Sequence, residues 1–398
     1  MERILNIDTS ANNAFFLWGA RKTGKTTFLK NRFQDAIYID LLKTNTAQKY
    51  ELKPDLLREE IVASEPALMI IDEIQKVPQL LDEIHWCIEN TSTKCILCGS
   101  SARKLIRMKA NLLGGRAWRY EMFPLTTREI GADFDLLRAM NHGLIPQHYF
   151  SNHPIRFLES YVLDYLSHEI KAEAMVRNVP AFHRFLEIAA ISNSEIVNFS
   201  SIARDCGVSS VTVKDYFQIL QDTLLGFMLH PFTKKIKRVP IESSKFYFFD
   251  MGITRALRRM LVIQEGSVEF GHFFEHFILM EIRAFLSYFN HYKNIYFWRT
   301  QCGKEVDLVI GEAEWAIEIK TSKHKSMKDF KGLIAFGEEF PHTKLIAITF
   351  DDSKRIIDRK IEVFPWQLFL KQLWNNQLTN YTNSNCPATP SATTLPLS

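Results

Sequence analysis

One stretch constrains this chain more than any other: Gly-Ala-Arg-Lys-Thr-Gly-Lys-Thr-Thr at positions 19–27. It follows the apolar run at 14–18 and leads into a segment of helix length at 25–33. A strand, a glycine-rich turn and a helix in this order point several backbone N–H groups and a lysine at one place, and this arrangement binds nucleotide phosphates. We therefore predict a phosphate site between the first strand and the first helix.

The spacing of the loop matches the P-loop pattern without a mismatch. Its glycines let the backbone close around phosphate oxygens, Lys25 supplies a positive charge to the β- and γ-phosphates, and Thr26 offers its hydroxyl to Mg²⁺. We expect ATP and Mg²⁺ as cofactors. The residues expected to contact the nucleotide are Gly19, Ala20, Arg21, Lys22, Thr23, Gly24, Lys25, Thr26 and Thr27.

Two later apolar runs end in polar residues. The run at 68–71 ends in Asp72 and Glu73, and the run at 94–98 ends in Gly99, Ser100 and Ser101. We expect Asp72 to hold the Mg²⁺ shell and Glu73 to orient an attacking water. Ser100 or Ser101 is expected to form a hydrogen bond to the γ-phosphate or to the attacking water. Three arginines are candidates for stabilising the transition state, with no spacing rule to select among them: Arg103, Arg116 and Arg119.

Length and composition favour several domains. A chain of 398 residues exceeds what one hydrophobic core usually organises. The net charge of +4 permits a nucleic-acid partner without requiring one. Neither a signal peptide nor a membrane-spanning run is apparent, so we expect a cytoplasmic protein without a membrane partner. Cys95 and Cys98 form a lone C-x-x-C in an apolar strand, which favours core packing over a metal site.

Strand and helix patterns predict an α/β protein in three parts and a tail. Residues 1–150 alternate apolar strands, at 14–18, 36–40, 67–72 and 94–98, with helices, which is typical of a parallel sheet. Residues 151–238 are helical. Residues 239–375 form a second α/β unit, with strands at 245–249, 305–310, 315–320 and 344–350 and helices at 270–289 and 365–374. Residues 376–398 are poor in large apolar side chains and are expected to be disordered.

The helical part contains a helix-turn-helix pattern at 200–216, with a glycine in the turn and a serine that can cap the second helix. The second helix offers Lys214, and the basic run 234–238 follows. These features favour contact with DNA of weak sequence preference, through its phosphates. Packing of the helices and a solvated basic linker are the structural alternative.

Several motifs together resemble one family, the prokaryotic AAA-type ATPases that carry a C-terminal domain of unknown function, DUF4143. The resemblance covers nearly the whole chain up to Trp374, and its motifs lie at 19–26, 71–78, 99–101, 113–116, 123–129 and 143–146. It implies a P-loop NTPase core, a winged-helix segment and a module similar to PD-(D/E)xK nucleases. The Walker A residues of the family fall on Lys25 and Thr26, its Walker B acids on Asp72 and Glu73, and its sensor on Ser100.

A second group of acids lies in the third part of the chain. Glu318 and Lys320 are two residues apart and share one face of a strand, and Asp307 lies on the strand before it. Taken alone, this pattern is also that of a solvated strand face. The family implies that Glu275, Asp307 and Glu318 bind Mg²⁺ and that Asp307, Glu318 and Lys320 act in nuclease chemistry.

We therefore expect an ATP-binding and ATP-hydrolysing protein whose nucleotide state controls DNA binding, with DNA cleavage by the C-terminal module left open. Its alternative is a nucleotide-switched regulatory protein with a catalytically silent nuclease-like module. ATP and DNA are the expected ligands. A protein partner and assembly with further copies of the chain stay open.

Overall fold

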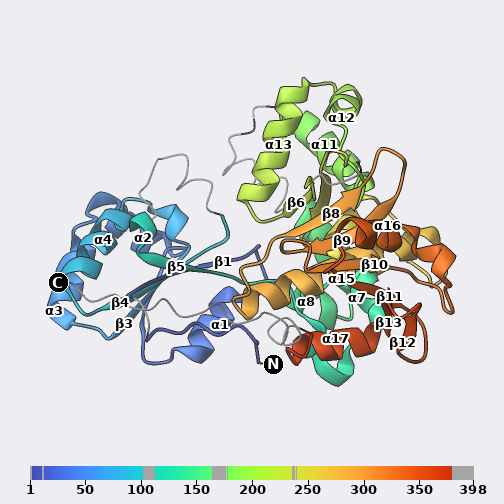
Figure 1. The fold of residues 1–398 in the computed structure, drawn as a ribbon. Coiled ribbons are helices and arrows are strands. Elements are labelled where there is room, and N and C mark those ends of the chain that lie inside the picture. The colour runs from blue at the N-terminus through green and yellow to red at the C-terminus, as the bar shows by residue number, and fades with distance from the viewer. Residues whose placement is uncertain are drawn as a thin grey trace, which may run out of the picture.

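The computed structural model describes residues 2–10, 13–101, 113–163, 176, 178–234, 238 and 240–378. Figure 1 shows two sheets side by side, with the N-terminal sheet on the left and the C-terminal sheet on the right. Helices α11 (Val179–Ile191), α12 (Phe199–Cys206) and α13 (Ser210–Asp222) stand above the C-terminal sheet in this view. The architecture is a parallel α/β core followed by a helical segment and a mixed sheet.

The N-terminal sheet is parallel throughout and has the order β2-β3-β4-β1-β5. Its strands are β1 (Ala14–Trp18), β2 (Ile37–Asp40), β3 (Leu68–Asp72), β4 (Lys94–Gly99) and β5 (Ala117–Glu121). β1 and β4 are buried along their apolar runs, as expected of parallel strands that are covered on both faces. Because β4 pairs with both β1 and β3, the carboxyl ends of these three strands meet at one edge.

The first four strands of this sheet are confirmed within one residue of their predicted bounds, whereas β5 was not predicted. Trp118 and Arg119 of β5 are exposed, so this edge strand has no continuous apolar run. Cys95 and Cys98 pack into different apolar clusters on β4, which confirms core packing. The helices between residues 25 and 150 are α1 (Lys25–Arg32), α2 (Thr44–Leu52), α3 (Leu56–Ser64), η1 (Ile74–Lys76), α4 (Leu80–Asn90), η2 (Leu113–Gly115), α6 (Thr127–Ile130), η3 (Gly131–Asp133), α7 (Leu136–His142) and α8 (Pro146–Phe150).

The second sheet has eight strands in the order β12-β13-β11-β10-β9-β8-β6-β7. They are β6 (Gly226–Pro231), β7 (Lys245–Phe248), β8 (Ile295–Arg299), β9 (Glu305–Ile310), β10 (Trp315–Ile319), β11 (Lys344–Thr349), β12 (Arg355–Ile357) and β13 (Ile361–Pro365). The helices in this region are α9 (Pro154–Ser160), α14 (Met251–Leu257), α15 (Val268–Tyr288), η5 (Met327–Phe330), α16 (Lys331–Glu339) and α17 (Trp366–Trp374). Since β6 pairs with both β7 and β8, the hairpin after the helical segment is part of this sheet.

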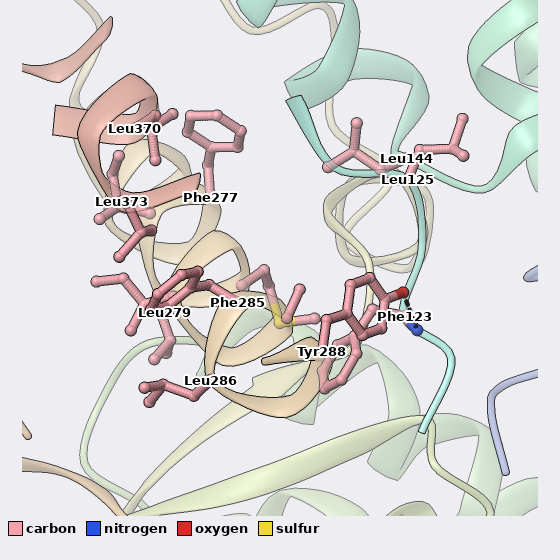
Figure 2. Packing of buried hydrophobic residues seen from close by; sticks show 14 of the residues in the cluster. Phe123, Leu125, Leu144, Phe277, Leu279, Phe285, Leu286, Tyr288, Leu370 and Leu373 are labelled. Carbon is pink, nitrogen blue, oxygen red and sulfur yellow. Dashed lines mark hydrogen bonds between the residues drawn. The ribbon is translucent and has the colours of Figure 1, made fainter. Parts of the chain in front are cut away.

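One apolar cluster joins the two sheets. It contains Leu5 and Phe15 from the N-terminal part together with Phe277 and Phe285 of α15. Figure 2 shows α15 and α17 packed through their apolar side chains, and a hydrogen bond from the backbone of Phe123 to the Tyr288 hydroxyl. The two sheets are therefore held against each other through α15. No helix in the described part of the chain is long and apolar enough to cross a membrane.

Candidate functional site

The glycine loop connects β1 to α1 in a shape that needs its glycines. Gly24 has φ of +97°, in the left-handed region that side chains disfavour. A Cβ on Gly19 would lie 2.6 Å from the carbonyl oxygen of Met122. Lys25 is buried, and its Nζ donates to the carbonyl oxygens of Gly19 at 2.7 Å and Ala20 at 3.0 Å. The ammonium group thus lies inside the loop, where phosphate oxygens would be bound.

Thr26 and Asp72 meet at the end of β3. The Thr26 hydroxyl donates to Asp72 Oδ2 at 2.7 Å, and the Tyr38 hydroxyl donates to the same oxygen. Burial and the adjacent Asp72 raise the pKa of Tyr38 above its ordinary value. Mg²⁺ at nucleotide sites takes one or two protein oxygens plus phosphates and water, so this pair fits such an ion.

Glu73, Gln75 and Ser100 form a second polar group beside this pair. Glu73 has φ of +59° and accepts hydrogen bonds from the Gln75 amide and, at 3.2 Å, from the Ser100 hydroxyl. The Gln75 amide also donates to Ser100 Oγ at 3.2 Å. A Cβ on Gly99 would lie 2.5 Å from Gln75 Oε1, so the glycine allows this close approach. The ends of β3 and β4 therefore place Glu73 and Ser100 in direct contact.

A cavity of about 630 Å³ opens beside the first turn of α1. Its size falls in the range of small-molecule sites. It adjoins the glycine loop, so the base and sugar of a nucleotide bound at the loop could enter it. The lining residues are Glu2, Arg3, Ile4, Leu5, Asn6, Gly24, Thr27, Phe28, Asn31, Arg32 and Pro146.

Arg3 connects the glycine loop to the C-terminal part. Its guanidinium donates to the carbonyl oxygens of Thr23 at 3.0 Å and Phe123 at 2.6 Å, and to the Tyr288 hydroxyl at 3.0 Å. Its Nε lies 2.9 Å from Glu129 Oε1, and both side chains are buried. Arg3 therefore contacts three other segments of the chain: the glycine loop, residues 123–129 and α15.

The other predicted residues of the N-terminal site are Ser101 and the arginines Arg103, Arg116 and Arg119. Ser101 donates to the carbonyl oxygen of Asp222, at the end of α13, over 3.5 Å. Arg116 pairs with Glu89 at 3.1 Å, and Arg119 is exposed on β5. Arg103 lies outside the described residues.

The predicted acids of the C-terminal part do come together. Asp307 on β9 accepts a hydrogen bond from the backbone N–H of Ile319 at 2.7 Å, and Glu318 on β10 pairs with Lys320 at 2.7 Å. Burial and the neighbouring acids Glu275 and Glu318 raise the pKa of Asp307 well above its ordinary value. Burial also raises the pKa of Glu318, although Lys320 opposes this.

The sequence did not indicate three further members of this group. Lys245 of β7 lies 3.4 Å from Glu275 Oε1 and 2.8 Å from Glu305 Oε1, and the Tyr247 hydroxyl donates to Glu275. We call Glu275, Glu305, Asp307 and Glu318 the carboxylate cluster. Burial alone would lower the pKa of Lys245, but the carboxylates of the cluster raise it above its ordinary value.

Each acid of the carboxylate cluster thus has a protein partner. Among the described residues, no group of three or more His, Cys, Asp or Glu side chains is arranged to hold a metal ion. One atom, Glu318 Oε2, is buried without a hydrogen-bond partner. As the side chains stand, the cluster does not fit a divalent ion.

The helix-turn-helix pattern is present as two helices, α12 and α13. Gly207 ends α12 with φ of +69°, and the Ser209 hydroxyl caps α13 by accepting from the backbone of Thr212 at 3.1 Å. Lys214 is exposed on α13 and lies over the Phe199 ring. The pattern predicted from the sequence therefore forms, with a basic side chain on its outer face.

The basic run 234–238 is partly occupied by ion pairs. Lys234 lies 4.0 Å from Glu312, and Arg238 pairs with Glu338 at 2.6 Å and Glu339 at 2.9 Å. Positions 235–237 lie outside the described residues. Arg238 is therefore less available for a phosphate than the run of charges suggested.

Sequence reasoning missed Arg3, Tyr38, Lys245, Tyr247 and Glu305, and it assigned no role to Gln75. Gln75 lies two residues after Glu73 in the motif at 71–78, so its position was visible although its role was not. Tyr38 lies on β2, which pairs with β3. Arg3 and Lys245 are far in sequence from the residues they contact, and no local pattern marks them.

Family models match three stretches of the chain. Residues 11–131 match an AAA domain, residues 134–262 a domain of unknown function (DUF8612), and residues 270–369 another domain of unknown function (DUF4143). The AAA match covers the five strands of the N-terminal sheet, and the DUF4143 match covers β8 to β13.

Two curated relatives are uncharacterized proteins of Mycobacterium bovis and Mycobacterium tuberculosis. Each is 25% identical over 324 residues, which is 78% of this chain and 71% of the relative. Among solved structures, a Walker-type ATPase of Pyrococcus abyssi has 13% identity and a TM-score of 0.43, over 62% of this chain and 91% of that one. A signal transduction ATPase with numerous domains from Pyrococcus horikoshii has 14% identity and a TM-score of 0.22, over 72% of this chain and 48% of that one.

Proposed function

Because this chain is a P-loop AAA-type ATPase with a C-terminal DUF4143 domain, we propose that it hydrolyses Mg²⁺-ATP at the carboxyl edge of the N-terminal sheet and that its nucleotide state controls DNA binding. The observation that carries the proposal is the meeting of Lys25, Thr26, Asp72, Glu73 and Ser100 at that edge.

Each residue has a task that its geometry suits. Lys25, inside the loop, binds the β- and γ-phosphates in place of the loop carbonyls. Thr26 and Asp72 hold the magnesium ion, which neutralises charge on the phosphates when it is bound. Glu73 orients the attacking water, and Ser100 positions Glu73 through their hydrogen bond. The cavity beside α1 accommodates the base and sugar.

Two contacts support transmission from the nucleotide to the rest of the chain. Ser101, next to Ser100, touches the end of α13 through Asp222. Arg3 binds the loop at Thr23 and α15 at Tyr288. A change of the loop or of β4 on hydrolysis would therefore act on the helix-turn-helix segment and on the C-terminal sheet.

DNA binding rests on the helix-turn-helix segment, which we take as a winged helix with the β6–β7 hairpin as its wing. Lys214 on the outer face of α13 and the lysines of the basic run 234–238 supply charge for phosphates, whereas Arg238 is paired with Glu338 and Glu339; affinity should therefore fall steeply with salt. A regulatory role through a protein partner or further copies of the chain is the second candidate. Every acid of the carboxylate cluster is bound by a protein group. This favours a nuclease-like module without catalytic activity over a module that cleaves DNA.

The test compares Lys25→Ala and Glu73→Gln with wild type for ATP affinity, ATP turnover and DNA affinity. Lys25→Ala is expected to lose nucleotide binding. Glu73→Gln is expected to bind ATP normally and to lose turnover by about 10²–10⁴-fold, because the group that orients the water has lost its charge. Fluorescence anisotropy of labelled duplex DNA, with ATP, ADP or no nucleotide at several salt concentrations, measures the coupling.

Lys53→Ala provides a control, since Lys53 is exposed at the end of α2. Unchanged ATP affinity and turnover in Lys25→Ala would refute the ATP site. Equal loss of ATP binding in Glu73→Gln would refute the role of Glu73. DNA affinity that is the same in every nucleotide state would refute the coupling and leave the regulatory candidate.

A further inference from the structure

The strand that carries Lys245 is not one of the strands that carry the acids predicted from the sequence. Lys245 begins β7, at the edge of the sheet next to β6. Its backbone pairs with Leu229 of β6 and forms a bridge to Ile196, just after α11. The side chain crosses to acids on α15 and β9. The β6–β7 hairpin that follows the helix-turn-helix segment therefore places Lys245 in the carboxylate cluster.

Lys245 is held there by two carboxylates at once. Its side chain is 6% exposed, and its Nζ lies 2.8 Å from Glu305 Oε1 and 3.4 Å from Glu275 Oε1. Tyr247, two residues further along the strand, donates its hydroxyl to the same oxygen of Glu275. Both side chains point from one face of β7, as residues two apart in a strand do. The contact is therefore built into the strand.

Four acids packed so closely need compensating positive charge, because a buried carboxylate without a partner is costly. Lys245 supplies this to Glu275 and Glu305, Lys320 supplies it to Glu318, and Arg299 lies 3.4 Å from Glu305. A divalent cation bound by Glu275 or Glu305 would compete for the oxygens that Lys245 contacts. An ammonium group and a metal ion cannot occupy the same place, so Lys245 competes with a metal ion for these two carboxylates.

We propose that Lys245 is the resident cation of the carboxylate cluster and that it excludes divalent metal ions from the DUF4143 domain. Removal of its charge frees oxygens of Glu275 and Glu305 in the cluster that also contains Glu318, whose Oε2 is buried and has no hydrogen-bond partner. The cluster then becomes a set of oxygen ligands, the type that Mg²⁺ and Mn²⁺ prefer. This inference does not depend on ATP hydrolysis.

The experiment uses the full-length protein without nucleotide and follows Mn²⁺ binding by electron paramagnetic resonance and by thermal unfolding. Lys245→Met removes the charge and keeps an apolar stem of similar length. It is expected to lower Tm, to bind Mn²⁺ at least tenfold more tightly than wild type, and to recover several degrees of Tm when Mn²⁺ is added. Wild type should show no such rise.

Two controls locate the effect. Lys344→Met removes another paired lysine of the same sheet, which lies 3.2 Å from Glu362, and should not gain Mn²⁺ binding. The double variant Lys245→Met with Glu318→Gln should lose the gained site. Because Mn²⁺ is measured without ATP, a failure of the ATPase proposal leaves this result unaffected.

The proposal is overturned if wild type binds Mn²⁺ as tightly as Lys245→Met through a site that Glu318→Gln removes. It is also overturned if Lys245→Met folds and gains no Mn²⁺ binding. If Lys245→Met does not fold, the proposal is tested by comparing Mn²⁺ binding by wild type with Mn²⁺ binding by Glu318→Gln. Equal Mn²⁺ binding by those two proteins supports exclusion, and weaker binding by Glu318→Gln contradicts it.

Discussion

Gly19 illustrates how one residue can set the geometry of the nucleotide site. It ends β1 and starts the loop, and a Cβ at this position would lie 2.6 Å from the carbonyl oxygen of Met122. Met122 directly follows β5, and its backbone N–H donates a hydrogen bond to the carbonyl oxygen of Trp18. Because this carbonyl oxygen of Met122 belongs to the backbone, it cannot rotate away from an added methyl group as the end of a flexible side chain could. The loop must therefore keep a glycine here for a reason that is separate from phosphate binding.

We expect Gly19→Ala to lower the free energy of unfolding by about 1–3 kcal/mol, because the added methyl group forces the loop or β5 to shift. The same shift should weaken ATP binding at least tenfold. Thermal unfolding and isothermal titration with ATP measure the two effects. Gly271→Ala is the matched control: Gly271 lies inside α15 with nothing within 4 Å of a Cβ, so a gain of about 0.5–1 kcal/mol is expected. Wild-type ATP affinity in Gly19→Ala would contradict the prediction.

Among the elements, α15 acts as the connector, and Glu281 is its polar contact. The buried carboxyl group of Glu281 accepts from the backbone and hydroxyl of Thr127, at 2.8 Å and 2.7 Å, and from Trp374 Nε1 at 2.6 Å. Thr127 starts α6, whose first turn has a capping box formed by Thr126 and Glu129. One carboxyl group thus joins α6, α15 and α17. Burial raises the pKa of Glu281 to about 7.

This pKa predicts a loss of stability as pH rises. Between 4.5, the ordinary value, and about 7, the folded chain keeps a proton that the unfolded chain releases. The stabilisation is complete below pH 4.5, declines through this window, and is lost above about pH 7. Its size is on the order of 3 kcal/mol.

Glu281→Gln should remove this contribution and flatten the pH dependence of the unfolding free energy between pH 5 and 7. Denaturant unfolding at several pH values measures it. Glu269→Gln, in the first turn of the same helix, leaves the contacts of Glu281 intact. It should keep the pH dependence of the unfolding free energy that wild type shows. A profile of Glu281→Gln that follows wild type would mean that Glu281 does not titrate in this window.

At the scale of the whole molecule, hydrogen bonds of Arg3 and Tyr288 link the glycine loop to the C-terminal part of the chain. The Tyr288 hydroxyl accepts from Arg3 at 3.0 Å and from the backbone N–H of Phe123 at 3.1 Å, the contact drawn in Figure 2. Arg3 in turn holds the carbonyl of Thr23 in the glycine loop. A movement of the loop would therefore reach the last turn of α15 through two hydrogen bonds.

Tyr288→Phe removes this link without removing the ring that packs against Phe123 and Trp374. We expect ATP to change amide hydrogen exchange in α15 of wild type and to leave that of Tyr288→Phe unchanged. The loss of a buried acceptor should cost about 1–3 kcal/mol of stability, while ATP affinity should change less than threefold. Tyr292→Phe, at a side chain that is 96% exposed, is the matched control. An ATP effect on α15 that persists in Tyr288→Phe would rule out this route.

The parts of the site that the sequence predicted are those made by short segments. Lys25 and Thr26 follow the glycine turn directly, and Asp72 and Glu73 follow an apolar run. Parallel pairing then brings the strand ends together, which the alternation of strands and helices implied. The acids Asp307 and Glu318 were found in the same way, since their strands are joined by a short turn. The edge strand β5 was missed because it has no continuous apolar run, and two of its five residues, Trp118 and Arg119, are exposed.

The sequence by itself determined the α/β class, the glycine loop and the strand ends that face it, because these depend on local periodicity and on backbone conformation. Only the tertiary structure decided that Arg3 joins the loop to α15 and that Lys245 enters the carboxylate cluster. Both are long cationic side chains whose partners are distant in the chain, at positions such as Tyr288 and Glu305. A buried charge needs an opposite charge close to it in the folded structure, and this partner can be far away in the sequence. The packing of the two sheets therefore determines which residues become partners.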